Sequence, residues 1–108
     1  MIKIHASLGK DEAFCLSAEG HAGAGRNEYD HDLVCCAVST LMGTLANSCA
    51  LIDDVNTVYH STKGNALVTV TNITDDIWPE IASRFRMALD GLQGLAIQYP
   101  KSLKVTEE

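Results

Sequence analysis

Two residues in the first third of the chain have the chemistry of a nucleophile and its base. Cys35 carries a thiol and His21 an imidazole, and a segment rich in small residues separates them. Cysteine attacks as the thiolate, and a nearby imidazole can take the thiol proton or pair with the anion. We therefore interpret Cys35 and His21 as a candidate catalytic pair. Because geometry rather than spacing defines such pairs, an inert core cysteine and a structural histidine stay open as alternatives.

The candidate thiol lies at the start of a long segment with helical periodicity. No charged residue occurs between Asp32 and Asp53. We expect Asp30 or Asp32 to cap this helix, which places Cys35 in about its first turn, where free amides and the helix dipole favour a thiolate. The apolar residues recur at steps of three and four, as one helical stripe does: Val34, Val38, Leu41, Leu45, Cys49 and Ile52.

The same segment is close to the length that spans a membrane. Polar residues such as Thr44 and Asn47 interrupt it, and flanking basic anchors are missing. We therefore expect a core helix, which is either buried within the domain or packed on both a sheet and a second subunit.

A glycine-rich segment joins the histidine to this helix. Gly20 ends the preceding strand where the backbone must turn sharply. No Gly-Lys-Ser/Thr follows, which argues against a phosphate-binding loop. We interpret residues 21–30 as a loop that closes on a substrate and opens again. Its small residues are Ala22, Gly23, Ala24 and Gly25.

The remaining pattern predicts one α+β domain over residues 1–108. Alternating apolar residues predict strands at 2–7, 13–19, 55–61, 66–71 and 103–106. A second helix, capped by Asp75 or Asp76 and containing Pro79 in its first turn, carries an apolar stripe to Tyr99. The order is ββαββαβ, which is typical of two helices packed on a largely antiparallel sheet.

Composition excludes some classes of partner. The net charge of −6 argues against direct nucleic-acid binding, and the N-terminal residues lack the pattern of a signal peptide, so we expect a cytoplasmic protein. We expect neither disulfides nor cofactors. Nothing in the spacing of His21, His31, Cys35 and Cys49 supports a metal site, and we predict none.

Two short motifs are similar to those of a known family. They are Gly20-His21-Ala22-Gly23, and the run from His31 to Ser39, which reads His-Asp-Leu-Val-Cys-Cys-Ala-Val-Ser. Together they resemble the ribosomal-processing cysteine protease family (Prp, YsxB-like), and the length and order of elements fit along the whole chain.

The resemblance implies roles for individual residues. It makes Cys35 the nucleophile and His21 the general base, with Asp32 capping the helix or orienting the site and Ser39 in support. It implies a homodimer that acts on a ribosomal protein precursor. The activity it implies is removal of the N-terminal extension of bacterial large-subunit ribosomal protein number twenty-seven.

Some residues depart from the family pattern. The segment between His21 and Cys35 is longer than usual, Asp30 replaces a common glycine, and Cys36 replaces the usual alanine. Two other classes of function stay open, namely a ribosome-associated module that only binds a peptide and a redox or metal switch built on Cys35 and Cys36.

Overall fold

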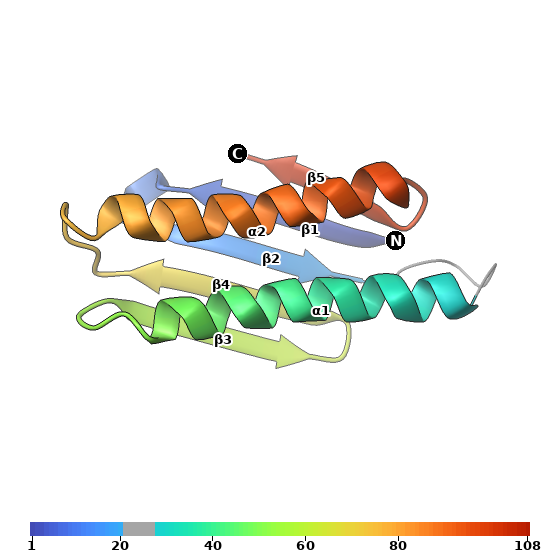
Figure 1. Ribbon diagram of the computed structural model, residues 1–108, viewed down its shortest axis with the longest axis horizontal. Helices are drawn as coiled ribbons and strands as arrows, with labels where there is room; N and C mark the ends of the chain where they lie inside the picture. The colour runs from blue at the N-terminus through green and yellow to red at the C-terminus, as the bar shows by residue number, and fades with distance from the viewer. Residues whose placement is uncertain (21–27) are drawn as a thin grey trace.

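The structure is a computed structural model that describes residues 1–20 and 28–108, and in the first helix the side chains from residue 33 onward. The chain forms one small domain of five strands and two long helices (Figure 1). Its elements follow in the order β1 (Ile2–Leu8), a 3-10 turn η1 (Lys10–Glu12), β2 (Phe14–Glu19), α1 (Glu28–Ala50), β3 (Asn56–Thr62), β4 (Asn65–Thr71), α2 (Trp78–Gln98) and β5 (Leu103–Glu107). The predicted ββαββαβ order is confirmed.

The five strands form one sheet in the order β3-β4-β2-β1-β5. Three of its four pairings are antiparallel, and β5 pairs with β1 in parallel. The sheet is therefore largely antiparallel, as predicted. The pairing of β2 with β4 brings the end of β2 beside the turn between β3 and β4, although a long helix separates them in the sequence.

Both helices lie on the same face of the sheet and divide it between them (Figure 1). Helix α1 contacts β3 and β4, whereas α2 contacts β1, β2 and β5. The two helices also pack against each other. The described residues thus form two layers, a sheet and a pair of helices that cover one of its faces.

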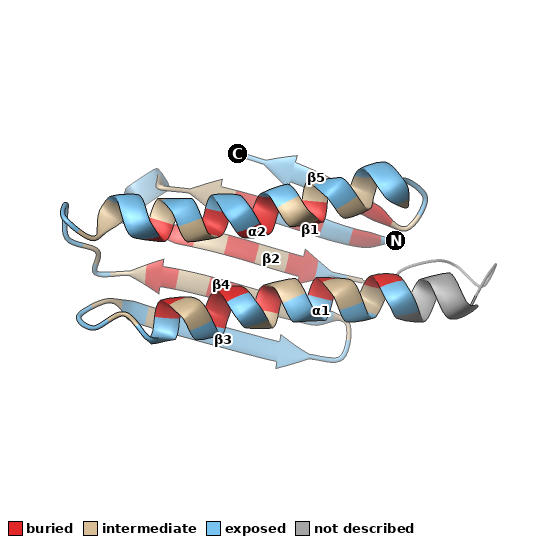
Figure 2. Cartoon of the chain, in the orientation of Figure 1, coloured by how far each residue is buried: buried red, intermediate tan, exposed pale blue. Residues whose placement is uncertain are grey.

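Apolar side chains fill the space between the sheet and the helices (Figure 2). They come from alternate positions of the strands and from one side of each helix. Val68 and Val70 are fully buried while Thr69 between them is not, which confirms the predicted alternation of β4. Phe14 packs against Trp78 and Phe85, with ring centroids 4.8 and 5.4 Å apart. The predicted stripe of α2 supplies the buried residues Ile81, Phe85, Leu89 and Leu92.

Helix α1 packs in this core through its predicted stripe. Val34, Val38, Leu45 and Cys49 are buried. Residues 33–50 are also long and apolar enough to cross a membrane by composition alone. The buried side of α1 lies against β4 and α2, as predicted for a helix packed on a sheet, whereas only 33% of this segment is buried.

Both predicted helix starts need correction. Helix α1 begins at Glu28, so Asp30 and Asp32 lie inside it and neither is its N-cap. Helix α2 begins at Trp78, and its N-cap position is taken by Ile77, whose apolar side chain cannot cap. Asp76 lies before the cap and accepts a hydrogen bond from the Thr74 hydroxyl. Acidic residues are favoured throughout a helix's first turn, so an early Asp or Glu does not identify the cap.

Candidate functional site

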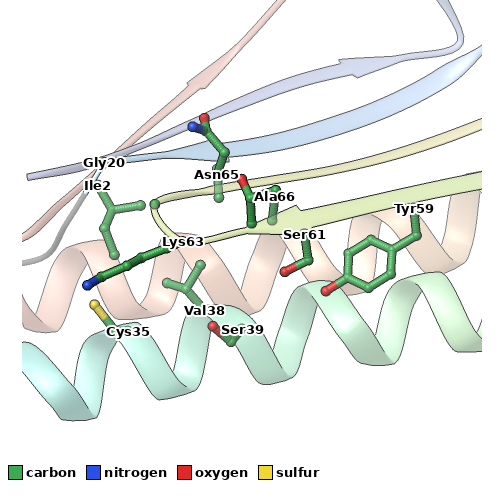
Figure 3. A pocket seen from close by; sticks show the side chains of 13 residues that line it. Ile2, Gly20, Cys35, Val38, Ser39, Tyr59, Ser61, Lys63, Asn65 and Ala66 are labelled. Carbon is green, nitrogen blue, oxygen red and sulfur yellow. The ribbon is translucent and has the colours of Figure 1, made fainter.

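A cavity of about 220 Å³ opens at the end of the domain where α1 meets the β3–β4 hairpin. Cys35 of α1 lines it and is half-buried. Figure 3 shows the sulfur directed into this space, facing the turn of the hairpin. A partly exposed thiol beside a cavity can meet a substrate, which a fully buried thiol cannot do.

The position of Cys35 along α1 differs from the prediction. Because the helix begins at Glu28, Cys35 lies about two turns inside it rather than in its first turn. At an interior position the backbone amide donates to the carbonyl four residues earlier, and the effect of the helix dipole falls off beyond the first turn. The amides of the helix start are therefore not available to stabilise negative charge at this sulfur.

Ser39 lies one helical turn after Cys35 and lines the same cavity. Its side chain is exposed and points from α1 toward the hairpin (Figure 3). The structure thus brings together Cys35 and its predicted supporting serine, as expected for residues four apart on one helix.

Gly20 forms the floor of the site at the end of β2. Its φ is +103°, and a Cβ there would lie 2.5 Å from the carbonyl oxygen of Met1. Its amide donates a hydrogen bond of 2.8 Å to the carbonyl oxygen of Gly64 in the hairpin turn. Only glycine fits this position, and its hydrogen bond holds the turn against the end of β2.

Several predicted site residues lie outside the described residues. These are His21 and the loop residues Ala22, Gly23, Ala24 and Gly25. For Asp32 the structure describes the backbone, which is helical. The pairing of His21 with Cys35 consequently stays a prediction.

The other cysteines lie away from the cavity. Cys36 is exposed, and its carbonyl accepts a hydrogen bond from Thr40. Cys49 is buried, and this burial raises the pKa of its thiol. It lies fourteen residues after Cys35 on the same helix, about 21 Å along the axis at 1.5 Å per residue. Cys35 and Cys49 therefore cannot bind one metal ion together.

The hairpin contributes cavity residues that the sequence analysis missed. Tyr59, Ser61, Lys63 and Asn65 line the cavity opposite α1 (Figure 3). The inward positions of β3 carry polar groups, whereas those of the other strands are apolar. This difference was the feature of the sequence that could have indicated a cavity here. The sequence could not place it beside Cys35, because that depends on the sheet order.

A half-buried thiol on the wall of a cavity is accessible to a substrate and can act as a nucleophile. The sequence model of the family described as cysteine protease Prp matches residues 1–104. The chain therefore belongs to the Prp family of cysteine proteases. Among curated proteins, none matches the sequence at a significant level.

Solved structures share the fold over the full chain. The ribosomal processing protease Prp from S. aureus, in complex with a covalently linked product peptide, matches with a TM-score of 0.78 and 18% identity, covering 100% of both chains. The same protease with a substrate peptide matches with a TM-score of 0.74 and 17% identity, again over 100% of both chains. SMU.848 from Streptococcus mutans matches with a TM-score of 0.70 and 25% identity, over 99% of this chain and 93% of that one.

Proposed function

We propose that this protease removes the N-terminal extension of bacterial large-subunit ribosomal protein number twenty-seven, with Cys35 as nucleophile and His21 as general base. The observation that carries the assignment is the position of Cys35, half-buried on the wall of the cavity. The likeness to the S. aureus ribosomal processing protease, solved with peptides, supports the choice of substrate class.

The proposed reaction has two halves. His21 takes the Cys35 proton, the sulfur forms a bond to the scissile carbonyl carbon, and the carbonyl π electrons move onto oxygen. When the oxyanion collapses, the carbon–nitrogen bond breaks and His21 gives its proton to the leaving amine. Water, deprotonated by His21, then attacks the thioester and releases the acid and the free thiol.

Family membership favours this protease over the module that only binds a peptide. A binding module needs no accessible thiol, whereas Cys35 lies at the cavity wall beside Ser39. Ser39 is in place to support a bound peptide near the reacting sulfur, and residues 22–25 serve in this proposal as the substrate loop.

A second copy of the chain is the further partner that we propose, in a cytoplasmic homodimer. Large apolar side chains stay exposed, with Leu51 84%, Met87 71% and Ile97 83% accessible. A groove of about 500 Å³ between α1 and α2 lies beside Met87 and is lined mainly by apolar surface, including Leu41 and Leu45. A second subunit placed on this groove would cover Met87 and the apolar lining of the groove.

Light scattering should give the mass of two chains, and a monodisperse monomer would refute the dimer.

The substrate assignment is tested with a peptide that spans the N-terminal extension of the ribosomal protein. We expect mass spectrometry to detect a single cut by the wild type and by Cys36→Ala, and none by Cys35→Ala. Circular dichroism controls for folding of each variant. Cleavage retained in Cys35→Ala would refute the nucleophile. Absence of cleavage by the wild type and by Cys36→Ala, with Cys35 still reactive toward alkylating reagents in both, would refute the proposed ribosomal substrate.

A further inference from the structure

The cavity of the candidate nucleophile also has a lysine in its lining. Lys63 lines the same cavity as Cys35. Figure 3 shows its side chain extending from the hairpin turn toward α1, with the amino nitrogen directed at the Cys35 sulfur. Among the described residues that line this cavity, Lys63 is the one with a charged side chain.

The backbone holds Lys63 in this place. Lys63 and Gly64 form a two-residue turn between paired Thr62 and Asn65. Gly64 has a φ of +83°, which favours glycine, and its carbonyl accepts the 2.8 Å hydrogen bond from the Gly20 amide. The turn is thus fixed to the end of β2, and the base of the lysine side chain is fixed with it.

Lys63 takes part in none of the ion pairs among the described residues. Those residues form ion pairs through His5, Lys10, Arg84 and Arg86, and none of these pairs includes Lys63. Its exposed ammonium group is available to an anion that forms within the cavity.

The reaction creates negative charge at this point twice. The sulfur is negative before attack, and the carbonyl oxygen becomes negative in the tetrahedral intermediate. Since Cys35 lies inside α1, the amides of the helix start do not reach either charge. A cation directed at the sulfur is suited to both.

We propose that Lys63 is a catalytic residue whose ammonium group stabilises the Cys35 thiolate and then the oxyanion of the tetrahedral intermediate. This inference rests on the proposed function for the second charge, but not for the first. Although the net charge of the protein is −6, Lys63 gives the cavity a local positive charge.

The test measures alkylation of Cys35 by neutral iodoacetamide and by anionic iodoacetate at pH 7 and low salt. The Cys36→Ala background isolates the thiol of interest, and peptide mapping identifies the modified cysteine. In each reaction the sulfur–carbon bond forms as iodide leaves. Variants are Lys63→Met, Lys63→Arg and the matched control Lys104→Met, which removes an equal charge from the exposed side of β5.

Two unit charges about 4 Å apart in water interact by about 1 kcal/mol, which corresponds to about fivefold in a rate or equilibrium constant. We therefore expect Lys63→Met to slow iodoacetamide about fivefold and iodoacetate by a larger factor, while Lys63→Arg and Lys104→Met stay within about twofold of the wild type. Salt near 1 M should shrink the difference, because it screens exposed charges. In peptide cleavage, kcat should fall more than KM rises.

Equal rates for Lys63→Met and the wild type with both reagents would overturn the proposal, as would an equal loss in Lys104→Met. Because alkylation needs no peptide, this result is independent of whether the proposed ribosomal substrate is cut. A wild type that alkylates as expected but cleaves nothing would contradict the proposed substrate and leave the role of Lys63 toward the thiolate supported.

Discussion

The two halves of the sheet are packed in different ways. Under α2, the inward side chains of β1 and β2 are apolar and nearly all buried, and Phe14 packs against Phe85 and Trp78. Under the first turns of α1, the inward residues of β3 are polar, and a cavity stays open beside Cys35. One half provides most of the core, and the incomplete packing of the other leaves room for a substrate.

The comparison predicts that the α2 half dominates stability. Phe85→Ala removes a fully buried ring from the centre of that half, and such changes cost about 3–5 kcal/mol. We expect a loss of this size in the free energy of unfolding by urea. Ser61→Ala on the opposite half serves as control, since Ser61 is exposed, and should change stability by less than about 0.5 kcal/mol. Similar losses in both would contradict the contrast.

The contact between Gly20 and the β3–β4 turn joins the two halves, and we expect substitution there to have the next largest effect. Gly20→Ala puts a Cβ at 2.5 Å from the backbone oxygen of Met1 and needs a φ of +103°. Left-handed backbone alone costs about 1–2 kcal/mol for a residue with a side chain. We expect at least that loss in urea unfolding, and a drop in cleavage because the turn that carries Lys63 shifts. Unchanged stability would show that β2 and the hairpin are not held in this way.

The smallest expected effect on stability is a difference between two alanine substitutions in α2, at Gly91 and at Gly94. Gly94 faces open space, so Gly94→Ala should raise stability by about 0.5–1 kcal/mol through helix propensity. At Gly91 a Cβ would lie 3.2 Å from the Leu41 side chain of α1, and repulsion there should offset that gain. Thermal unfolding of both variants measures the difference. An equal gain in both would mean that α1 and α2 are less closely packed than described.

Sequence periodicity predicted most of this architecture. Alternation in β4 and the stripe of α2 reflect burial on one side, which is a local property of the chain. The predicted start of α1 was wrong because an aspartate such as Asp30 suits a cap and a first turn equally well. Helical glycines are ambiguous from sequence: a Cβ at Gly91 would lie 3.2 Å from the Leu41 side chain of α1, whereas Gly94 faces open space.

The candidate site was predictable only in part. Cys35, Ser39 and Gly20 stand in motifs that the resemblance identifies, and the structure places all three at one cavity. Lys63 belongs to no such motif, and it reaches the site because β4 pairs with β2. Contacts that depend on strand order are not encoded in local spacing, so the sequence analysis missed this residue.

The most direct test of the account is to locate the acyl group during turnover. The wild type is mixed with the ribosomal extension peptide, quenched in acid within the first turnovers, and analysed by tandem mass spectrometry. We predict a thioester between the extension and Cys35 that is absent in His21→Ala. An acyl group on Cys36, or cleavage without any adduct on Cys35, would contradict the central claim.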